Sequence, residues 1–283
     1  MDAIRRLAPY VAHLRLPFQA TLAPIFLWGA LLSGGSWDGG TTAAFVALHL
    51  FLYPAATAFN SAYDRDVGPV GGLEAPPEVP PRLLGFALTF AALGTLPAFW
   101  AGWPFPIVYC LIAGWTAAYS HPRTRWKASP CRSAAAIALG QGALGFLAGW
   151  LATASPDAAA GTLVAGAVGT GFTALGFYPA TQVYQIDEDR RRGDRTMAVV
   201  LGAAGALRLG SLCLVAAAGV TAWLAAGHFG PSDAVLIALG FAALVLMQMR
   251  PIRRPTYRRS MRLLNAGTGA FLLFIALEAI GRG

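Results

Sequence analysis

Charged side chains are scarce in this chain. Asp, Glu, Lys and Arg together make up 12% of its 283 residues, whereas 56% of the residues are hydrophobic. Soluble globular domains carry about 25% charged residues. The chain therefore has too little charge to cover so large an apolar content in water. This shortage excludes a soluble domain and a disordered chain, and it predicts a polytopic membrane protein.

Cysteine, histidine and lysine are also rare. The three cysteines stand far apart without a C-x-x-C pair, which excludes a disulfide scaffold. The four histidines are dispersed, and the chain has no G-x-S-x-G, P-loop or H-E-x-x-H motif, so none of these soluble-type catalytic sites is expected. A net charge of +8 suggests nucleic acid in a soluble chain. Here the placement of that charge indicates topology instead, and no nucleic-acid partner is expected.

Nine apolar segments approach the length of about 20 residues that a membrane-spanning helix needs. They are 18–35, 41–63, 82–100, 104–120, 132–153, 159–183, 206–226, 233–249 and 263–280. We therefore predict an all-α membrane protein with nine transmembrane helices. The whole chain, 1–283, is expected to form one polytopic domain, with a first motif half in 1–131 and a second in 132–283.

The basic residues sort onto alternate connections between these segments. All of the 21 Lys and Arg residues except Arg282 fall on one side, and the connections 36–41, 101–104, 154–158 and 227–232 contain none. The positive-inside rule then places the N-terminus in the cytoplasm and the C-terminus outside. The expected location is a cytoplasmic membrane of the prokaryotic type, in contact with the lipid bilayer.

The acidic residues gather in two of the connections on the basic side. They are Asp64, Asp66, Glu74 and Glu78 after the second segment, and Asp187, Glu188, Asp189 and Asp194 after the sixth. Charges at a membrane boundary are often only solvated loop residues. Two patterns in the sequence favour a functional site over that interpretation.

The first pattern is an internal repeat. The stretch 53-YPAATAFNSAYDRDVG-68 aligns without a gap to 178-YPATQVYQIDEDRRRG-193 at an offset of 125. It predicts two duplicated halves in parallel orientation, with the second and sixth segments as equivalent helices.

The second pattern is a spacing. Asn60 and Asp64 are four residues apart, as are Gln185 and Asp189, so each pair is expected on one face of a helix. Carboxylates that face each other across a cavity need a cation between them. With substrate phosphate oxygens they suit Mg²⁺. Arginines and the sole lysine, Lys127, adjoin these acids, so a lipid diphosphate with its metal fits such a site.

At this point the motifs resemble those of the UbiA superfamily of intramembrane prenyltransferases. The family's N-x-x-x-D-x-x-x-D motif is similar to 60-NSAYDRDVG-68, and its second aspartate-rich motif is similar to 184-YQIDEDRRRGDRT-196. A Tyr-Ser-x-Pro stretch followed by a basic residue appears as 119-YSHPRTRWK-127, and an Arg-x-Pro as 15-RLP-17. The resemblance implies a UbiA-like bundle of nine helices around a lipid-open cavity with its polar site facing the cytoplasm.

The resemblance also implies roles for particular residues. Asp64, Asp189 and Asn60 would be catalytic, and Asp64, Asp66, Asp187, Asp189 and Asp194 are the candidate Mg²⁺ ligands. Arg15, Arg65, Lys127 and Arg195 would bind the diphosphate, while Tyr119, Tyr184 and Gln185 would orient the substrates.

Two departures from the family pattern leave the ligand set open. Gly68 stands where the family has the last aspartate of the first motif, and Asp66 or Glu74 can replace it. The second motif lacks a strict D-x-x-x-D. The intervening stretch 67-VGPVGGLEAPPEVPPR-82 is too rich in Gly and Pro for a regular helix, and is either a lid over the cavity or an exposed linker.

Three functions remain as alternatives. The first is Mg²⁺-dependent transfer of an isoprenyl group from a prenyl diphosphate to a hydrophobic acceptor, either aromatic or lipid. The second is a membrane terpene cyclase of the same type, acting on the diphosphate alone. The third is a non-catalytic lipid-binding or transport protein.

Overall fold

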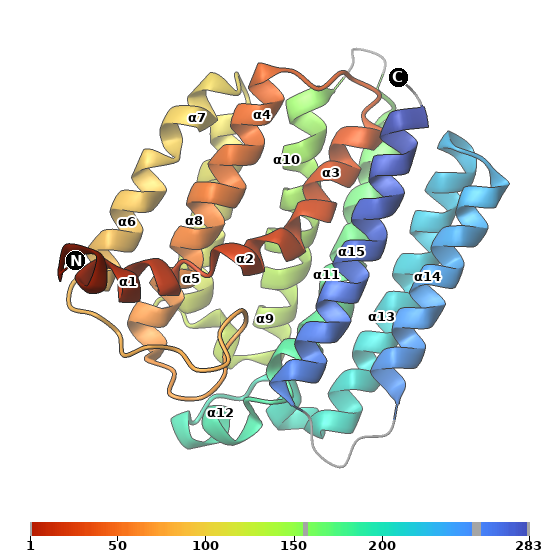
Figure 1. Cartoon of the computed structure of the whole chain (residues 1–283). Coiled ribbons are helices and arrows are strands. Elements are labelled where there is room, and N and C mark those ends of the chain that lie inside the picture. Colours follow the sequence, from red (N-terminus) through yellow and green to blue (C-terminus); the bar gives the residue numbers. More distant parts are fainter. Residues whose placement is uncertain (1, 155–157, 251–255, 282–283) are drawn as a thin grey trace.

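The computed structural model describes residues 2–154, 158–250 and 256–281. Their regular structure is helical, apart from one isolated bridge between Val70 and Leu73 (Figure 1). The helices are α1 (Asp2–His13), α2 (Leu16–Gln19), η1 (Ala20–Leu22), α3 (Ala23–Leu32), α4 (Gly39–Val46), η2 (Ala47–Leu52), α5 (Tyr53–Asp64), α6 (Leu83–Leu93), α7 (Thr95–Trp100), α8 (Phe105–Ser120), η3 (Trp126–Ala128), α9 (Pro130–Ala135), η4 (Ala136–Ala143), α10 (Leu144–Thr153), α11 (Ala160–Gln182), α12 (Ile186–Arg192), α13 (Met197–His228), α14 (Pro231–Met249) and α15 (Tyr257–Gly281). The predicted all-α class is confirmed.

Seven helical segments of the described chain are long and apolar enough to cross a membrane, where nine were predicted. They are Gly39–Asp64, Leu83–Trp100, Pro130–Thr153, Ala160–Gln182, Met197–His228, Pro231–Met249 and Tyr257–Gly281. The predicted segment 104–120 corresponds to α8, which has only 16 residues. The predicted segment 18–35 is divided among α2, η1 and α3. Pro17 and Pro24 are the second residues of α2 and α3, and proline fits the first turn of a helix but not its interior.

Helix α13 begins earlier than predicted. The apolar pattern indicated a start at residue 206, whereas the helix runs from Met197 and is kinked at Gly202, whose φ of 68° and ψ of 166° are not helical. Glycine adopts a positive φ without the steric cost that a side chain imposes. The predicted segment is thus the straight part of α13 beyond the kink.

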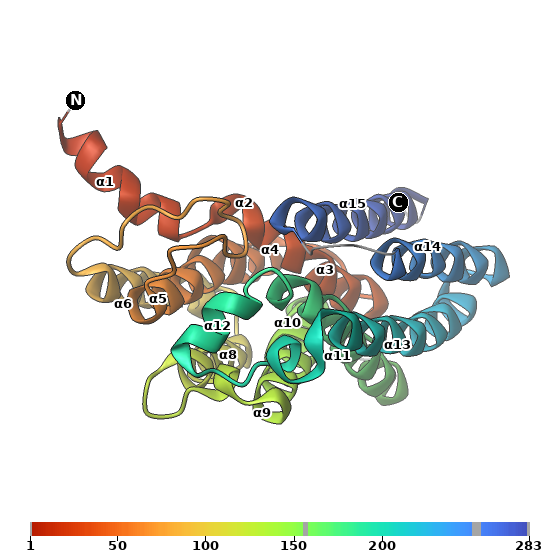
Figure 2. The same cartoon turned by 90° about the horizontal axis from the view of Figure 1, so that it is seen from below.

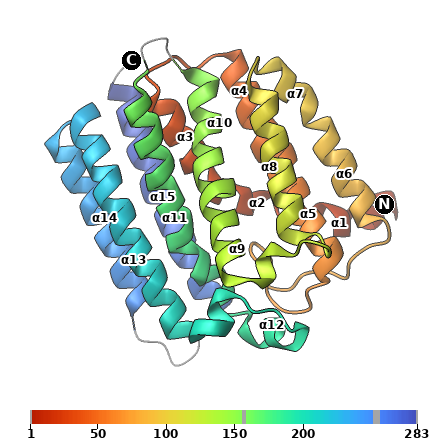
Figure 3. The ribbon, with the colours of Figure 1, turned by 180° about the vertical axis from the view of Figure 1, so that it is seen from behind.

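Small residues allow the central helices to approach closely. Gly29 of α3 lies against the backbone of Phe146, and Gly149 of α10 lies against the backbone of Phe26, so a Cβ at either glycine would collide with the opposite helix. These contacts place α3 beside α10 (Figure 3). Packing of this kind replaces the hydrophobic effect as the force that holds helices together in lipid.

The outer faces of the C-terminal helices are apolar. Leu212 and Trp223 of α13, Leu239 and Leu246 of α14 and Leu273 of α15 are each more than half exposed. An exposed apolar surface of this extent fits a protein that meets lipid instead of water.

The connections rich in charge gather at one end of the bundle. Residues 65–82, 121–129 and 183–196, with the short helix α12, lie together at the bottom of Figure 1, and Figure 2 shows α12 across the face of this end. The connections 33–38 and 101–104 lie at the other end. We call the end that carries residues 65–82, 121–129 and 183–196 the polar end. The alternation of the basic residues along the sequence predicted that these connections lie on one side.

Candidate functional site

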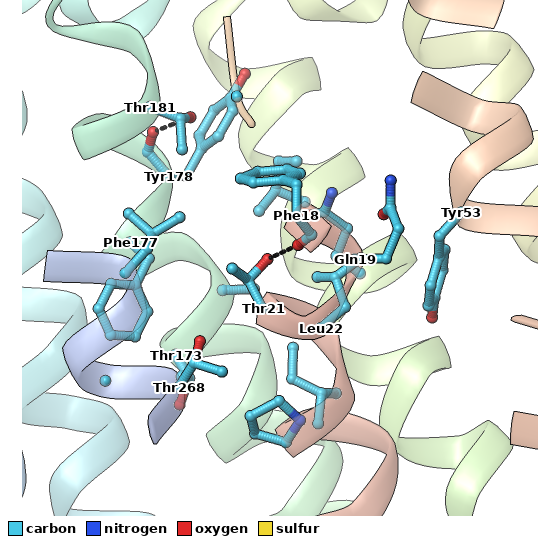
Figure 4. A pocket seen from close by; sticks show the side chains of 18 of the residues that line it. Phe18, Gln19, Thr21, Leu22, Tyr53, Thr173, Phe177, Tyr178, Thr181 and Thr268 are labelled. Carbon is cyan, nitrogen blue, oxygen red and sulfur yellow. Dashed lines mark hydrogen bonds between the residues drawn. The ribbon is translucent and has the colours of Figure 1, made fainter. Parts of the chain in front are cut away.

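A cavity of about 590 Å³ extends from the polar end into the bundle. Side chains from α2, α3, α5, α8, η4, α11, α12, α14 and α15 line it, and Figure 4 shows part of the wall, including Phe18, Tyr53 and Phe177. Most of its charged lining residues belong to the segments of the polar end; of the others, Asp64 ends α5 and Arg15 lies between α1 and α2. Leucines of α14 and α15 line it elsewhere, among them Leu236 and Leu273, which are also exposed at the outer surface. The cavity therefore joins a charged site to an apolar chamber that reaches the side of the bundle.

The first acidic motif ends helix α5. Asn60 and Asp64 lie one turn apart on this helix, as predicted, and both line the cavity. Nδ2 of Asn60 donates to Oγ of Ser120 at 3.0 Å. The carboxylate of Asp64 is 6% exposed, contacts Nζ of Lys127, and lies 3.5 Å from Nη1 of Arg125. The buried charge of Asp64 is therefore neutralised from the loop that follows α8.

Asp66 supplies a second carboxylate from the same motif. Its side chain is 5% exposed, lines the cavity, and accepts a hydrogen bond from Nη1 of Arg192 at 2.7 Å. Between the two aspartates, Arg65 takes a left-handed φ of 49°, and its side chain is exposed and lines no part of the cavity. Glu74 lies outside the cavity and pairs with Arg258. Of the two candidates for the missing aspartate, Asp66 is the one that reaches the site.

The second motif does not continue a membrane helix as the first does. Helix α11 ends at Gln182, soon after Pro179, and α12 starts at Ile186. Gln185 caps α12 with a φ of −104°, and its Nε2 donates to the carbonyl of Pro69 at 3.1 Å. Gln185 lines the cavity, and its carbonyl accepts a hydrogen bond from the N–H of Asp189 at 2.9 Å, so the two residues lie one helical turn apart as expected. That turn belongs to α12 and not to the end of α11. Similar sequences in the repeat therefore have different local structures.

Asp189 and Asp194 line the cavity from the side of the second motif. Oδ2 of Asp189 accepts a hydrogen bond from Thr196 Oγ1 at 3.0 Å, and burial raises the pKa of Asp189 to about 6. Asp194 is 7% exposed and accepts two hydrogen bonds from Arg125, Nε to Oδ1 at 3.0 Å and Nη2 to Oδ2 at 2.8 Å. Asp187 is 88% exposed and lines no part of the cavity. The structure thus brings Asp189 and Asp194 to the site and leaves Asp187 outside.

Two of the four predicted diphosphate-binding residues lie at the cavity. Arg15 is buried, and its guanidinium donates to Ser61 Oγ at 2.7 Å and to the carbonyl of Gly71 at 3.2 Å. Lys127 is buried as well; burial lowers the pKa of its ammonium, and the neighbouring Asp64 opposes that shift. Both therefore present a positive charge to the cavity from different segments.

The other two predicted phosphate ligands, Arg65 and Arg195, have exposed side chains outside the cavity. The backbone N–H of Arg195 donates to the carbonyl of Ala128 at 3.1 Å, which joins the loop before α13 to η3. Neither side chain is placed to contact a ligand in the cavity.

Of the two tyrosines predicted to orient the substrates, one lines the cavity and the other does not. Tyr119 lines the cavity, with its hydroxyl 2.9 Å from that of Tyr178. Tyr184 does not line the cavity; its ring packs edge-to-face on Tyr257, and its buried hydroxyl has no hydrogen-bond partner among the described residues.

Three functional contacts were not expected from the sequence. Arg125 joins Asp64 to Asp194, Arg192 joins Asp66 to Glu188, and Thr196 holds Asp189. Each residue stands within or beside a quoted motif. The spacing of four residues indicates the pair of Glu188 and Arg192 within α12, but no spacing indicates the other contacts. The pairs Arg125–Asp64, Arg125–Asp194 and Arg192–Asp66 join segments that only the folded chain brings together, and Thr196 reaches Asp189 through the turn after α12.

The stretch after the first motif covers part of the cavity. Val70 and Gly71 line it. The φ of 86° at Gly72 favours glycine, and a side chain there would collide with Phe18. The Glu74 carboxylate accepts a hydrogen bond from Nε of Arg258 at 2.7 Å, which ties the stretch to the start of α15. The stretch is therefore a cover over the site and not a free linker.

The carboxylates fit Mg²⁺ only together with a ligand that supplies further oxygens. No group of three or more His, Cys, Asp or Glu side chains suited to a metal ion occurs within residues 2–154, 158–250 and 256–281. However, Oδ1 of Asp64 is buried and accepts no hydrogen bond from the described residues. Mg²⁺ is commonly held by one or two carboxylates plus substrate phosphates. The donor set therefore suits a metal that arrives with a phosphate.

The fold is similar to the folds of solved UbiA homologues. A UbiA homologue from Archaeoglobus fulgidus bound to GPP and Mg²⁺ is 19% identical, with 96% of this chain and 98% of that chain covered and a TM-score of 0.76. The same homologue bound to DMAPP and Mg²⁺ gives a TM-score of 0.75 at the same identity and coverage. An apo UbiA homologue from Aeropyrum pernix K1 is 17% identical over 94% of this chain and 98% of that chain, with a TM-score of 0.68.

Comparison with curated proteins gave no match. The sequence model of the UbiA prenyltransferase family, in contrast, matches residues 22–276, which is most of the chain. With the shared fold and the two acidic motifs at one cavity, this match establishes that the chain belongs to the UbiA prenyltransferase family.

Proposed function

We propose that the protein transfers an isoprenyl group from a prenyl diphosphate to an aromatic or lipid acceptor within the membrane, in a Mg²⁺-dependent reaction. One observation carries this proposal: four carboxylates and four cationic side chains meet at the charged end of a mainly apolar cavity. Family membership supports it, as do the Archaeoglobus fulgidus homologues, which bind GPP or DMAPP with Mg²⁺.

The carboxylates would hold the metal from two sides. Asp64 and Asp66 belong to the first motif, and Asp189 and Asp194 belong to the second. Bound Mg²⁺ neutralises the diphosphate and so stabilises it as a leaving group.

The acidic and basic side chains of the site form ion pairs with one another. Asp64 pairs with Lys127, Asp66 with Arg192, and Asp194 with Arg125. A diphosphate with its metal offers both kinds of partner, so the cationic side chains would pair with the phosphate oxygens and the carboxylates would hold the metal. Cationic groups around the leaving group stabilise the charge that develops as the C–O bond breaks.

The apolar part of the cavity keeps water from the reacting carbon. Trp115, Phe177 and Tyr178 line it, and aromatic faces stabilise an adjacent cation by about 0.5–2 kcal/mol each. Tyr119 and Asn60 are held by hydrogen bonds at the boundary between the charged and apolar parts, where they would orient the diphosphate and its first isoprene unit.

We also propose that α8 and the broken segment of α2, η1 and α3 complete a nine-segment bundle, with the polar end facing the cytoplasm. The supporting observations are the alternation of the connections and the absence of Lys and Arg from those at the other end.

To test this proposal, purified protein is incubated with geranyl, farnesyl or geranylgeranyl diphosphate and Mg²⁺, with and without aromatic and lipid acceptors. Diphosphate release that depends on an acceptor, and is lost in Asp64→Asn and Asp189→Asn, is the expected result. Cyclised hydrocarbon or alcohol formed without an acceptor would identify a cyclase instead. No release with any chain length or acceptor would indicate a non-catalytic lipid-binding protein.

A further inference from the structure

A second cavity, of about 260 Å³, lies where the ends of α11 and α14 meet the start of α15. It shares no lining residue with the first cavity. Three arginines line it: Arg250, Arg259 and Arg262. The apolar part of the wall consists of Ala180, Val183, Leu207, Met247 and Leu263, and the other polar lining residues are Gln248, Thr256 and Ser260. Basic pockets between membrane helices, close to one membrane surface, suit anionic lipid headgroups.

The positive charge of this cavity has no acidic counterpart. Within the described residues, none of the three arginines forms an ion pair, whereas the neighbouring Arg258 pairs with Glu74. Asp233 is the single acidic residue between Arg195 and Glu278, and it lies in the first turn of α14, at the end remote from Arg250. Arg250 and Arg262 are exposed, so the positive charge of the site is accessible to an anion from outside the chain.

Arg259 is fixed in place with donors to spare. Its Nη2 donates to the carbonyl of Met247 at 3.0 Å and to that of Arg250 at 2.7 Å, so it joins the end of α14 to α15. Its Nε and Nη1 have no partner among the described residues. The start of α15, where Thr256 and Ser260 line the cavity, adds the positive end of a long helix.

Gln248 provides an independent indication of a ligand. The side chain is 3% exposed and lines the cavity. Its Nε2 donates to the carbonyls of Gly176 and Leu207 and to Ser211 Oγ. Its Oε1 is buried and accepts no hydrogen bond from the described part of the chain. Buried acceptors are almost always satisfied, so this oxygen needs a donor, which either water or a bound molecule supplies.

We propose that the second cavity binds an anionic phospholipid whose headgroup carries hydroxyl groups, as phosphatidylglycerol does. The three guanidinium groups surround the phosphate, a headgroup hydroxyl donates to Gln248 Oε1, and the apolar wall receives the glycerol backbone and the start of an acyl chain. This site is separate from the proposed prenyl-diphosphate site and does not depend on it.

The test measures binding to purified protein in a neutral detergent, so it is independent of any catalytic activity. Phosphatidylglycerol, phosphatidylcholine with the same acyl chains, and inorganic phosphate are added in separate titrations, and the unfolding temperature is recorded. We expect phosphatidylglycerol alone to raise the unfolding temperature. An equal rise with inorganic phosphate would overturn the lipid assignment in favour of a free-anion site. An equal rise with phosphatidylcholine, or no rise with phosphatidylglycerol, would also overturn the proposal.

Variants then locate the site. Arg250→Gln/Arg262→Gln should weaken the apparent affinity for phosphatidylglycerol about tenfold or more, because two charge-assisted contacts are lost. Arg123→Gln/Arg132→Gln has the same net charge and changes exposed side chains away from this cavity, so it should match the wild type within about twofold. Equal weakening in both double variants would show non-specific attraction and overturn the assignment.

Native mass spectrometry of the wild-type protein keeps the proposal testable if the first double variant does not fold. Preferential retention of phosphatidylglycerol over phosphatidylcholine from an equimolar mixture is expected. Equal retention of the two lipids would contradict the proposal.

Discussion

Arg125 donates to both carboxylate oxygens of Asp194, with distances of 3.0 and 2.8 Å, and its Nη1 lies 3.5 Å from Asp64. One guanidinium therefore joins the loop after α8 to both acidic motifs. Arg125 takes a left-handed φ of 39°, which is an uncommon backbone conformation for a residue other than glycine.

We expect Arg125→Gln to lower the stability of the protein by about 1–3 kcal/mol, because Asp194 is left buried without its bidentate partner. Thermal unfolding in detergent measures this loss. Arg125→Lys keeps the charge but loses the paired geometry, so it should recover only part of the stability. Arg123→Gln, an exposed neighbour, is the control. A loss in Arg123→Gln as large as in Arg125→Gln would contradict the role given to the bidentate pair.

Asp187 and Asp189 provide a matched pair on helix α12. Asp189 lines the cavity, whereas Asp187 is 88% exposed outside it. Asp189→Asn should reduce Mg²⁺-dependent diphosphate release by about 100-fold or more, because a proposed metal ligand is lost, whereas Asp187→Asn should stay within about twofold. Initial rates at saturating Mg²⁺ decide between them. Similar losses in both variants would show that the second motif binds metal in another arrangement.

Lys127 is expected to bind the diphosphate. Lys127→Met should raise KM for the prenyl diphosphate about tenfold or more, since one charge-assisted contact to a phosphate oxygen is lost. Lys127→Arg should restore much of the affinity. The measurement is KM at saturating Mg²⁺, with the folded fraction checked by size-exclusion chromatography. An unchanged KM in Lys127→Met would limit Lys127 to neutralising Asp64.

Metal binding should depend on pH through Asp189. Burial raises the pKa of this carboxyl from its ordinary value to about 6, so the group is ionised above about pH 6 and protonated below it. Mg²⁺ binds the ionised form, so its apparent affinity should fall as the pH drops below about 6, by up to tenfold per pH unit. The half-saturating Mg²⁺ concentration for diphosphate release, measured from about pH 5 to pH 7.5, reports this change.

Thr196→Val tests the assignment of that pH dependence. The hydroxyl of Thr196 donates to Asp189 and lowers the pKa of Asp189. Its loss should therefore move the midpoint of the dependence to higher pH. A midpoint that stays in place would indicate that another group titrates.

The contact between α3 and α10 should be sensitive to one methyl group. Gly149→Ala places a Cβ against the backbone of Phe26 and should destabilise the protein by about 1–3 kcal/mol. Gly219→Ala on α13 is the matched control, because no atom lies within 4 Å of the added Cβ, and alanine is favoured over glycine inside a helix. Thermal unfolding compares the two; a Gly149→Ala protein as stable as the control would contradict the close contact.

The sequence was sufficient to predict the first motif because its geometry is local. Asn60 and Asp64 are separated by one helical turn, and the helix that carries them is continuous to its end. The same spacing places Gln185 and Asp189 one turn apart at the start of α12, but it did not reveal that α11 ends before them. The periodicity of a sequence indicates a helix but not the residue at which one helix gives way to another.

The charge partners could not be predicted because they are not local. Among Arg123, Arg125 and Lys127, all within one loop, only the last two reach the acidic motifs. That selection depends on the left-handed turn at Arg125 and on the position of α8 relative to α5. Similarly, the predicted first span, 18–35, is a mainly apolar run in the sequence, but it is divided among the end of α2, η1 and α3, with Pro24 in the first turn of α3.

Leucines of α14 and α15 belong both to the cavity wall and to the outer apolar surface of the bundle. A ligand that enters the cavity past these leucines comes from the membrane. A molecule that passes between them exchanges with the surrounding leaflet, so its effective concentration depends on how strongly it partitions there and not on its level in solution. Each additional CH₂ favours the hydrocarbon by about 0.8 kcal/mol, so two more carbons raise the local concentration roughly tenfold or more. By this route, the membrane itself favours long-chain ligands before any side chain of the protein discriminates among them.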